Sequence, residues 1–146
     1  MFKQITVFIE NKPGRLAEVT GYLANENINL HALSIADTTE FGILRMIVSN
    51  PDKASRILKE NNLMAQTTDV IAVAVGHNPG SLHKVLHKLE ALKVSIEYMY
   101  AFTSRHKDYD AIVILRLANQ DMVVDKLKNS GIPILGQELL DKLNEA

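Results

Sequence analysis

The chain opens with a short apolar run and then changes to a helical rhythm. Residues 5–9 are rich in β-branched and aromatic side chains, which is typical of a strand, and Pro13-Gly14 interrupts the run. From Arg15 onward, apolar residues recur every three or four positions with polar residues between them: Leu16, Val19 and Leu23. This spacing predicts an amphipathic helix directly after the turn.

The next residues predict two more strands, a helix and a fourth strand. Apolar runs at 28–36 and 43–48 are separated by a turn at 40–42. Asn50-Pro51 marks a helix start, because Asn can cap the free amides and Pro suits the first helical position. A fourth strand is predicted at 64–68. The order βαββαβ places both helices on one face of an antiparallel sheet, with strand order 4-1-3-2.

The same order returns in the second half of the chain. The predicted elements are strands at 71–75, 94–103, 112–117 and near Ile134, and helices at 81–92 and 120–129. The fold class is therefore α+β, with two ferredoxin-like βαββαβ domains, predicted at residues 1–69 and 70–146.

Individual residues also repeat. Residues 11–16 read Asn-Lys-Pro-Gly-Arg-Leu and residues 77–82 read His-Asn-Pro-Gly-Ser-Leu, at an offset of 66. A five-residue insertion in the second copy would align Ile43-Leu44-Arg45 with Ile114-Leu115-Arg116. A repeat of this length is about right for a small domain. Function is expected in the repeated turn or where two copies meet.

The two first strands, 5–9 and 71–75, are apolar at nearly every position. Helices on one face of a sheet account for only half of those positions. We therefore expect the second face to be covered, by pairing of the two copies or by a second chain, and we expect a homodimer.

Composition excludes several classes of protein. Formal charges nearly cancel, at −1, which gives no indication of nucleic acid or an anionic membrane as partner. The absence of cysteine excludes disulfides, thiolate catalysis and sulfur-ligated metals. No apolar run approaches about 20 residues, the length of a membrane span. We expect a soluble cytoplasmic protein.

These features together resemble one family. The turn at 11–16, Asn27-Ile28-Asn29-Leu30 at the second strand and Gly42-Ile43-Leu44-Arg45-Met46 in the third are similar to those of ACT domains, small regulatory modules of amino-acid metabolism. The resemblance covers essentially the whole chain as two tandem copies. It implies that a free amino acid binds where two such domains meet, beside the first turn.

The resemblance also implies particular ligand-binding residues. Asn11 precedes the basic-Pro-Gly turn and Asn29 opens the second strand, the two positions that hold the ligand in many family members. The second copy has His77 and Ser95 there instead. The second site is therefore expected to differ in ligand or to be empty.

The chemistry of these residues suits a zwitterion. The backbone amides of Gly14, Arg15 and Leu16 lie at a predicted helix N-terminus, which favours a carboxylate. Asn29, followed by Leu30, offers a carbonyl that can receive the ammonium group. The second copy repeats the turn with Asn78, Gly80, Ser81 and Leu82. The alternative is that both Pro-Gly turns only start helices, with Asn11 as a cap.

Other candidates have simpler interpretations. His83, His87 and Glu90 have metal-ligand spacing, but they flank an apolar stripe as a solvated helix face does. Tyr98, Tyr100 and Phe102 invite comparison with RNA-binding sheets, but they are more typical of a domain interface. The segment 104–108 is interpreted as an ordinary polar hairpin loop.

No catalytic motif is present, neither a phosphate-binding glycine loop nor a nucleophile elbow. We therefore expect a non-enzymatic amino-acid sensor that needs no cofactor or metal and that has a separate metabolic enzyme as a candidate partner. The alternative is a ligand-free structural subunit that docks on such an enzyme. A small enzyme is a third, weaker option.

Overall fold

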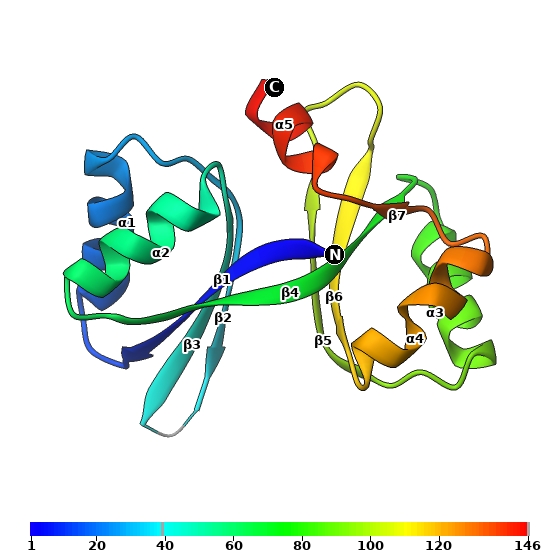
Figure 1. Ribbon diagram of the computed structural model, residues 1–146, viewed down its shortest axis with the longest axis horizontal. Helices are drawn as coiled ribbons and strands as arrows, with labels where there is room; N and C mark the ends of the chain where they lie inside the picture. The colour runs from blue at the N-terminus through cyan, green and yellow to red at the C-terminus, as the bar shows by residue number, and fades with distance from the viewer. Residues whose placement is uncertain (39, 146) are drawn as a thin grey trace. The chain divides into compact units, whose positions relative to one another are not determined.

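The computed structural model describes residues 1–38 and 40–145 (Figure 1). The chain divides into two compact units: Lys3–Thr68, called the N-terminal unit, and Met1–Phe2 with Asp69–Ala146, called the C-terminal unit. The first half of the chain forms β1 (Phe2–Glu10), α1 (Arg15–Asn25), β2 (Leu30–Asp37), β3 (Phe41–Val48), α2 (Pro51–Glu60) and β4 (Met64–Val75).

The second half forms α3 (Ser81–Ala91), β5 (Ile96–Thr103), β6 (Ala111–Leu117), α4 (Gln120–Asn129), β7 (Ile134–Leu135) and α5 (Glu138–Glu145). The predicted order of elements is confirmed, with boundaries that shift by a few residues. Asn50 caps α2 as expected, because its side-chain oxygen accepts a hydrogen bond from the Lys53 amide at 3.1 Å.

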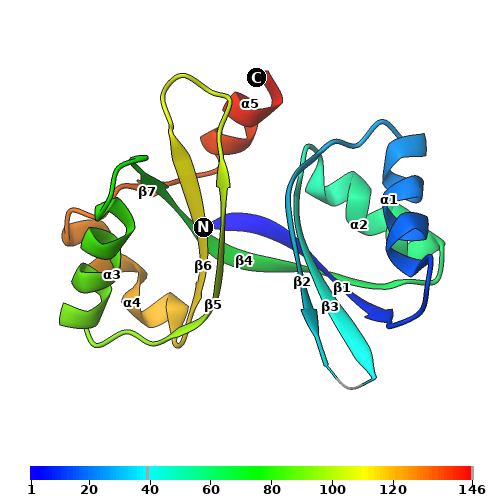
Figure 2. The same cartoon turned by 180° about the vertical axis from the view of Figure 1, so that it is seen from behind.

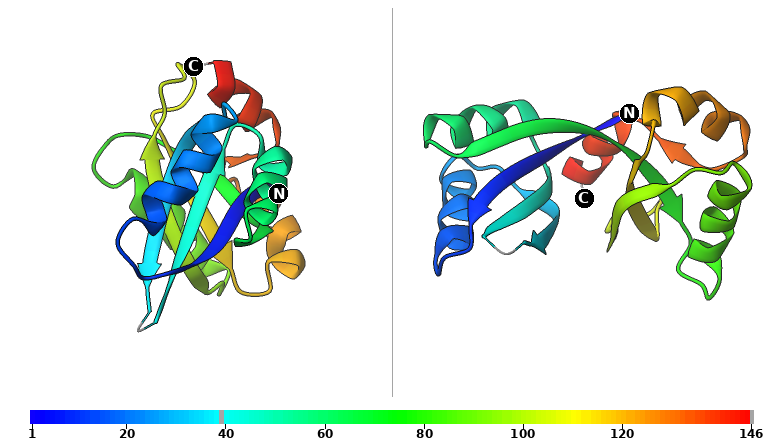
Figure 3. Two further views of the ribbon diagram at one scale, coloured as in Figure 1. Left: turned by 90° about the vertical axis from the view of Figure 1, so that its left-hand side faces the viewer. Right: turned by 90° about the horizontal axis from the view of Figure 1, so that it is seen from below.

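The sheet of the N-terminal unit has the strand order β2-β3-β1-β4, with β1 and β2 both antiparallel to β3. Helices α1 and α2 lie on one side of it (Figure 3). The core between them contains Ile5, Val7 and Ile9 of β1 together with Leu44 and Met46 of β3. The predicted order 4-1-3-2 is therefore confirmed in this unit.

In the C-terminal unit β4 lies between β7 and β6, and β6 pairs with β5 (Figure 2). This is the same order as in the N-terminal unit. Helices α3 and α4 cover one side, over a core that includes Ile71, Val73, Val113 and Leu115. The α+β class with two ferredoxin-like repeats is confirmed.

The strand registers correct the alignment of the repeat. Ile5 pairs with Met46, and its counterpart Ile71 pairs with Leu115. Met46 therefore corresponds to Leu115, which is an offset of 69 and an insertion of three residues rather than five. The letters Ile-Leu-Arg at 43–45 and 114–116 match only by coincidence of composition, and Arg45 and Arg116 are not equivalent.

Two predicted strands, 64–68 and 71–75, are one continuous strand, β4. Two residues lie between them, and the carbonyl oxygen of the first, Asp69, accepts hydrogen bonds from Arg116 Nη1 at 2.6 Å and from Gln120 Nε2 at 3.0 Å. The junction between the repeats is therefore regular structure.

Helix α5 was not expected from the sequence. It follows β7 and lies beside the β5–β6 hairpin (Figures 1 and 2). Its apolar residues Leu139, Leu140 and Leu143 are buried. On its polar side Lys142 Nζ donates to Asp108 Oδ2 at 3.2 Å and to the Tyr109 hydroxyl at 3.1 Å. These bonds fasten the helix to the hairpin loop.

Candidate functional site

The turn between β1 and α1 exposes backbone donors. Gly14 is the N-cap residue of α1 with φ of 84°, a left-handed conformation that glycine adopts without strain, and no side chain caps the helix. The Arg15 amide donates to the Lys12 carbonyl at 3.3 Å, and the Glu18 amide donates to the Gly14 carbonyl at 3.0 Å. The intervening amides of the first helical turn remain available to an anion.

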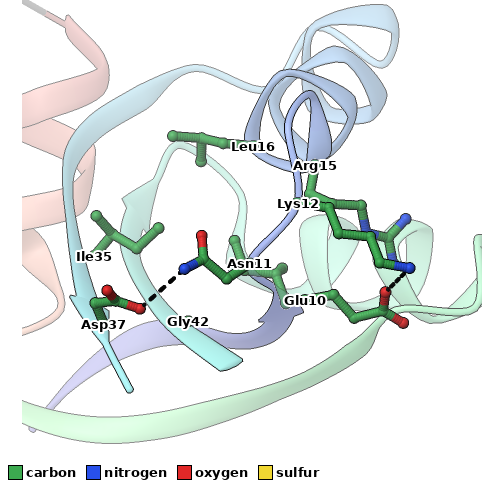
Figure 4. Close-up of a pocket in the computed structure, with 9 residues that line it drawn as sticks. Glu10, Asn11, Lys12, Arg15, Leu16, Ile35, Asp37 and Gly42 are labelled. Carbon is green, nitrogen blue, oxygen red and sulfur yellow. Dashed lines mark hydrogen bonds and ion pairs between the residues drawn. The ribbon is translucent and has the colours of Figure 1, made fainter. Parts of the chain in front are cut away.

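A pocket of about 280 Å³ lies beside this turn, and we call it the Asn11 pocket (Figure 4). Its lining combines an apolar part, Ile9, Leu16, Ile35 and Gly42, with a polar part, Glu10, Asn11, Lys12, Arg15 and Asp37. The charged groups are two cations and two anions, so the lining is neutral overall. A small ligand with both charges and an apolar side chain fits such a lining.

Two polar contacts order the pocket. Asn11 Nδ2 donates to Asp37 Oδ1 at 3.3 Å, so Asn11 does not cap the helix as the alternative interpretation required (Figure 4). Lys12 Nζ lies 2.7 Å from Glu10 Oε2. The hydrogen bond and then the charge of Lys12 hold the pKa of the Glu10 carboxyl below its usual range.

Arg15 is held along the helix surface. Its Nη1 donates to Glu18 Oε2 at 2.8 Å, and Glu18 Oε1 accepts from the Tyr22 hydroxyl at 2.8 Å. The bonds from Tyr22 and Arg15 lower the pKa of Glu18, and the same carboxylate raises the pKa of Tyr22. Arg15 Nε is buried and has no hydrogen-bond partner within residues 1–38 and 40–145.

Asn29 and Leu30 lie far from this pocket. Asp37, which bonds Asn11, is at the end of β2, whereas Asn29 precedes its first residue. Eight steps of strand at about 3.3 Å each place Asn29 about 26 Å from Asp37. The Asn29 carbonyl accepts from the Ser49 amide at 2.9 Å, and Leu30 packs against the core. A single unit therefore does not bring Asn29 to the turn.

The second turn repeats the backbone of the first. Gly80 has φ of 87° and is the N-cap of α3. The Ser81 amide donates to the Asn78 carbonyl at 3.1 Å, and the Lys84 amide donates to the Gly80 carbonyl at 3.1 Å. Ser95 also matches Asn29, since its carbonyl accepts from the Ala118 amide at 2.9 Å.

The side chains at the second turn are different. A pocket of about 420 Å³ contains His77, Asn78, Gly80 and Leu82 in a lining that is otherwise mostly apolar. At the offset of 66, the four charged residues of the Asn11 pocket correspond to uncharged ones: Glu10 to Gly76, Lys12 to Asn78, Arg15 to Ser81 and Asp37 to Thr103. The turn geometry is duplicated, but the ion pairs are not.

Sequence reasoning identified Asn11, Arg15 and Leu16 at the pocket and missed Ile9, Glu10, Lys12, Ile35, Asp37 and Gly42. Asp37 and Gly42 pair across the β2–β3 hairpin, and Ile9 pairs with Gly42. The signal for them is therefore strand register, which brings the hairpin end beside the turn.

The remaining candidates stay on the surface. The rings of His83 and His87 stack at 5.9 Å, and His87 Nδ1 lies 3.3 Å from Glu90 Oε2. Within the described part of the chain, no cluster of three His, Asp or Glu side chains has a metal-binding arrangement. Nor does any helix there combine the length and apolarity that crossing a membrane requires.

Comparison with known proteins gives a family. A family model described as an ACT domain pair matches residues 1–143. A crystal structure of a Bacteroides thetaiotaomicron protein is 48% identical in sequence, with a TM-score of 0.85 over 97% of this chain and 96% of that chain.

Two further relatives have described roles. The regulatory subunit of aspartate kinase from Thermus thermophilus shares the fold, with a TM-score of 0.59 at 18% identity over 88% of this chain and 92% of that chain. A probable acetolactate synthase small subunit of Archaeoglobus fulgidus is 33% identical over 69 residues. That match spans 45% of this chain and 43% of the relative, less than half of each.

Proposed function

This chain belongs to the family of ACT domain pairs, and on that premise we propose that it is a regulatory protein that binds a free amino acid in the Asn11 pocket. The observation that carries the proposal is the neutral set of two cations and two anions beside open helix amides and an apolar wall. A zwitterion needs donors for its carboxylate and acceptors for its ammonium group within a few ångströms.

In the proposed complex the ligand carboxylate lies at the turn formed by Gly14, Arg15 and Leu16 and accepts from the open amides of the first helical turn, among them that of Leu16, where the helix dipole favours a negative charge. The ammonium group is received at Asn29. Because Asn29 of the same unit is about 26 Å from Asp37 by strand length, the Asn29 in question comes from another ACT unit. The protein is therefore proposed to be a homodimer in which each Asn11 pocket is completed by Asn29 of the other chain.

The apolar wall supports one class of ligand. Ile9, Leu16 and Ile35 line the pocket, and any charged side chain placed against them would lose hydration without a partner. We therefore expect aliphatic amino acids to bind better than acidic or basic ones. With roughly 8 heavy atoms, such a ligand should have a dissociation constant between about 1 μM and 1 mM.

The proposed role is non-catalytic: binding would change the activity of a separate metabolic enzyme. The similarity to the Thermus aspartate kinase regulatory subunit and to the probable acetolactate synthase small subunit of Archaeoglobus supports this role. A second candidate is a ligand-free structural subunit. The half-exposed Leu33, Ile35 and Phe41 favour it, because large apolar side chains on a surface are typical of docking sites.

Thermal denaturation of the full chain with each of the twenty amino acids at about 10 mM separates the two functions. Binding predicts a rise in melting temperature for a few aliphatic amino acids and none for the rest. Calorimetry then measures affinity for the parent and for Asn11→Ala, with His83→Ala as the control. The structural-subunit function is supported instead if no amino acid gives heat or stabilisation.

A further inference from the structure

The C-terminal unit contains a second pocket that the repeat does not account for. It has a volume of about 390 Å³ and lies against the β5–β6 hairpin loop, lined by His77, Thr103, Ser104, Arg105, His106, Lys107, Tyr109 and Asp110. This loop carries the three-residue insertion that the strand registers establish. The shorter loop of the N-terminal unit, 38–40, reads Thr-Thr-Glu and has no basic residue.

The two carboxylates of the hairpin loop are already engaged. Asp108 Oδ2 accepts from Lys142 Nζ at 3.2 Å, and that bond holds the pKa of the Asp108 carboxyl low. Asp110 Oδ2 accepts from the His77 amide at 3.3 Å. Arg105 and Lys107 are exposed, and neither has an ion pair with any residue that the structure describes. The Asp110 carboxylate also lines the pocket, so the lining has two positive charges against one negative charge and keeps a net positive charge.

Hydroxyl groups in the pocket are arranged as donors. The Ser104 hydroxyl oxygen accepts from the His106 amide at 3.0 Å, and the Tyr109 hydroxyl oxygen accepts from Lys142 Nζ at 3.1 Å. Because each oxygen already accepts a hydrogen bond, its own O–H proton is free to donate. His106 Nδ1 accepts from the Asp108 amide at 3.2 Å, which leaves Nε2 to carry the ring proton.

The loop itself is ordered without a ligand. The Tyr109 amide donates to the His106 carbonyl at 3.1 Å, and the Ser104 amide donates to the Asp110 carbonyl at 3.2 Å. Lys142 of α5 fastens the loop from the other side and lies 5.1 Å from the centre of the Tyr109 ring. A preformed loop loses little conformational entropy when it binds a ligand.

From these contacts we propose that the β5–β6 hairpin pocket binds a small dianion, a phosphate or dicarboxylate group of a metabolite, between Arg105 and Lys107. The guanidinium group supplies a planar pair of donors suited to phosphate or carboxylate, and the ammonium group supplies a second charge. The Ser104 and Tyr109 hydroxyls complete the donor set. The hairpin pocket of the C-terminal unit would then bind one ligand, and the Asn11 pocket of the N-terminal unit would bind another.

Titration of the ¹⁵N-labelled full chain with inorganic phosphate, and separately with malonate, tests the site by amide chemical shifts. We expect saturable shifts at residues 104–110 for at least one of the two probes. The double variant Arg105→Gln/Lys107→Gln should weaken that binding at least tenfold. The control Lys126→Gln/Lys128→Gln removes two exposed charges from α4 and should change the affinity less than twofold.

The proposal is overturned if neither probe saturates at up to about 20 mM. It is also overturned if the α4 control weakens binding as much as the loop variant, since the effect would then be general attraction of anions to a lysine-bearing surface. Tighter binding of phosphate or of malonate identifies which dianion the pocket prefers. Both results are independent of amino-acid binding in the Asn11 pocket, which the loop variant should leave unchanged.

Discussion

The two Pro-Gly turns of this protein share a backbone and differ in chemistry. Gly14 and Gly80 have φ of 84° and 87°, and the same two hydrogen bonds close each turn. The Asn11 pocket nevertheless has four charged residues, whereas the pocket beside the Gly80 turn has no Asp, Glu, Lys or Arg. Duplication thus kept what helix initiation requires, while the side chains diverged. Turn geometry alone is therefore not evidence of a ligand, and the charged lining is the feature that carries the proposal.

The largest effect on amino-acid binding should come from replacing the glycine of each turn in separate variants. Gly14→Val and Gly80→Val each force a β-branched residue into the left-handed region, at a cost of about 1–2 kcal/mol in the free energy of unfolding. Urea denaturation should give similar losses for both. Calorimetry should show that amino-acid binding disappears only with Gly14→Val. Equal loss of binding in both variants would mean that the two pockets are not chemically distinct.

The second comparison is between Asn29→Ala and Ser95→Ala. If Asn29 of another unit receives the ligand ammonium, its removal should weaken amino-acid binding by about 1.5–3 kcal/mol, the scale of a hydrogen bond to a charged group. Ser95→Ala should cost less than about 0.5 kcal/mol, which is typical of surface changes. Titration calorimetry on folded variants measures both. Parent-like affinity of Asn29→Ala would contradict the assignment of the ammonium site.

A smaller effect is expected from Asp37→Ala. This change removes the acceptor that orients Asn11 Nδ2 and leaves one cation of the pocket unbalanced, so affinity should fall by about 1 kcal/mol. Thr103→Ala, at the equivalent position, should leave amino-acid affinity unchanged. A matched decrease for both would indicate that the hairpin end acts only on the stability of each turn.

The smallest expected effect is on the pH dependence of stability, through Glu18. The folded-state pKa of Glu18 lies below its unfolded value because Tyr22 and Arg15 bond the ionised form. Its contribution to stability is therefore present above the unfolded pKa and is lost as pH falls through the lower folded pKa. In the second copy Lys84 and Lys88 occupy the positions of Glu18 and Tyr22. The hydrogen bonds of Glu18 are therefore not repeated there. Glu18→Gln should lower the urea midpoint at pH 7 slightly.

Urea titrations from pH 7 to pH 3 should show the midpoints of Glu18→Gln and the parent converging as acid protonates Glu18 in the parent. Glu90→Gln on α3 is the control, because it removes an exposed carboxylate from the other copy. A constant difference at all values of pH would show that the carboxylate charge is not involved.

Periodicity was sufficient to predict the elements from β1 to β7 and the strand order, because each element buries one face at its own repeat. It was not sufficient for register. Ile43-Leu44-Arg45 resembles Ile114-Leu115-Arg116 letter by letter, yet hydrogen bonding shifts the true correspondence by two residues. Leu139, Leu140 and Leu143 of α5 do have helical spacing, but the helix has only eight residues, so the pattern is short.

The same distinction applies to the site. Asn11, Arg15 and Leu16 were predictable because they adjoin a turn whose residues are diagnostic in sequence. Asp37 and Gly42 reach the pocket only through the pairing of β2 with β3, which local sequence does not specify. Asn29 and Asn11 were predicted to hold the same ligand, but β2 places them at opposite ends of one sheet.

The continuous strand β4 has a consequence for proteolysis. A protease must draw several residues of extended, unfolded backbone into its active site, and the usual place to cut a tandem repeat is the linker. Here Val70 is buried and the neighbouring Asp69 carbonyl accepts two hydrogen bonds. Residues 69 and 70 are therefore protected from cleavage, and fragments that begin or end there should be recovered only after the strand has unfolded.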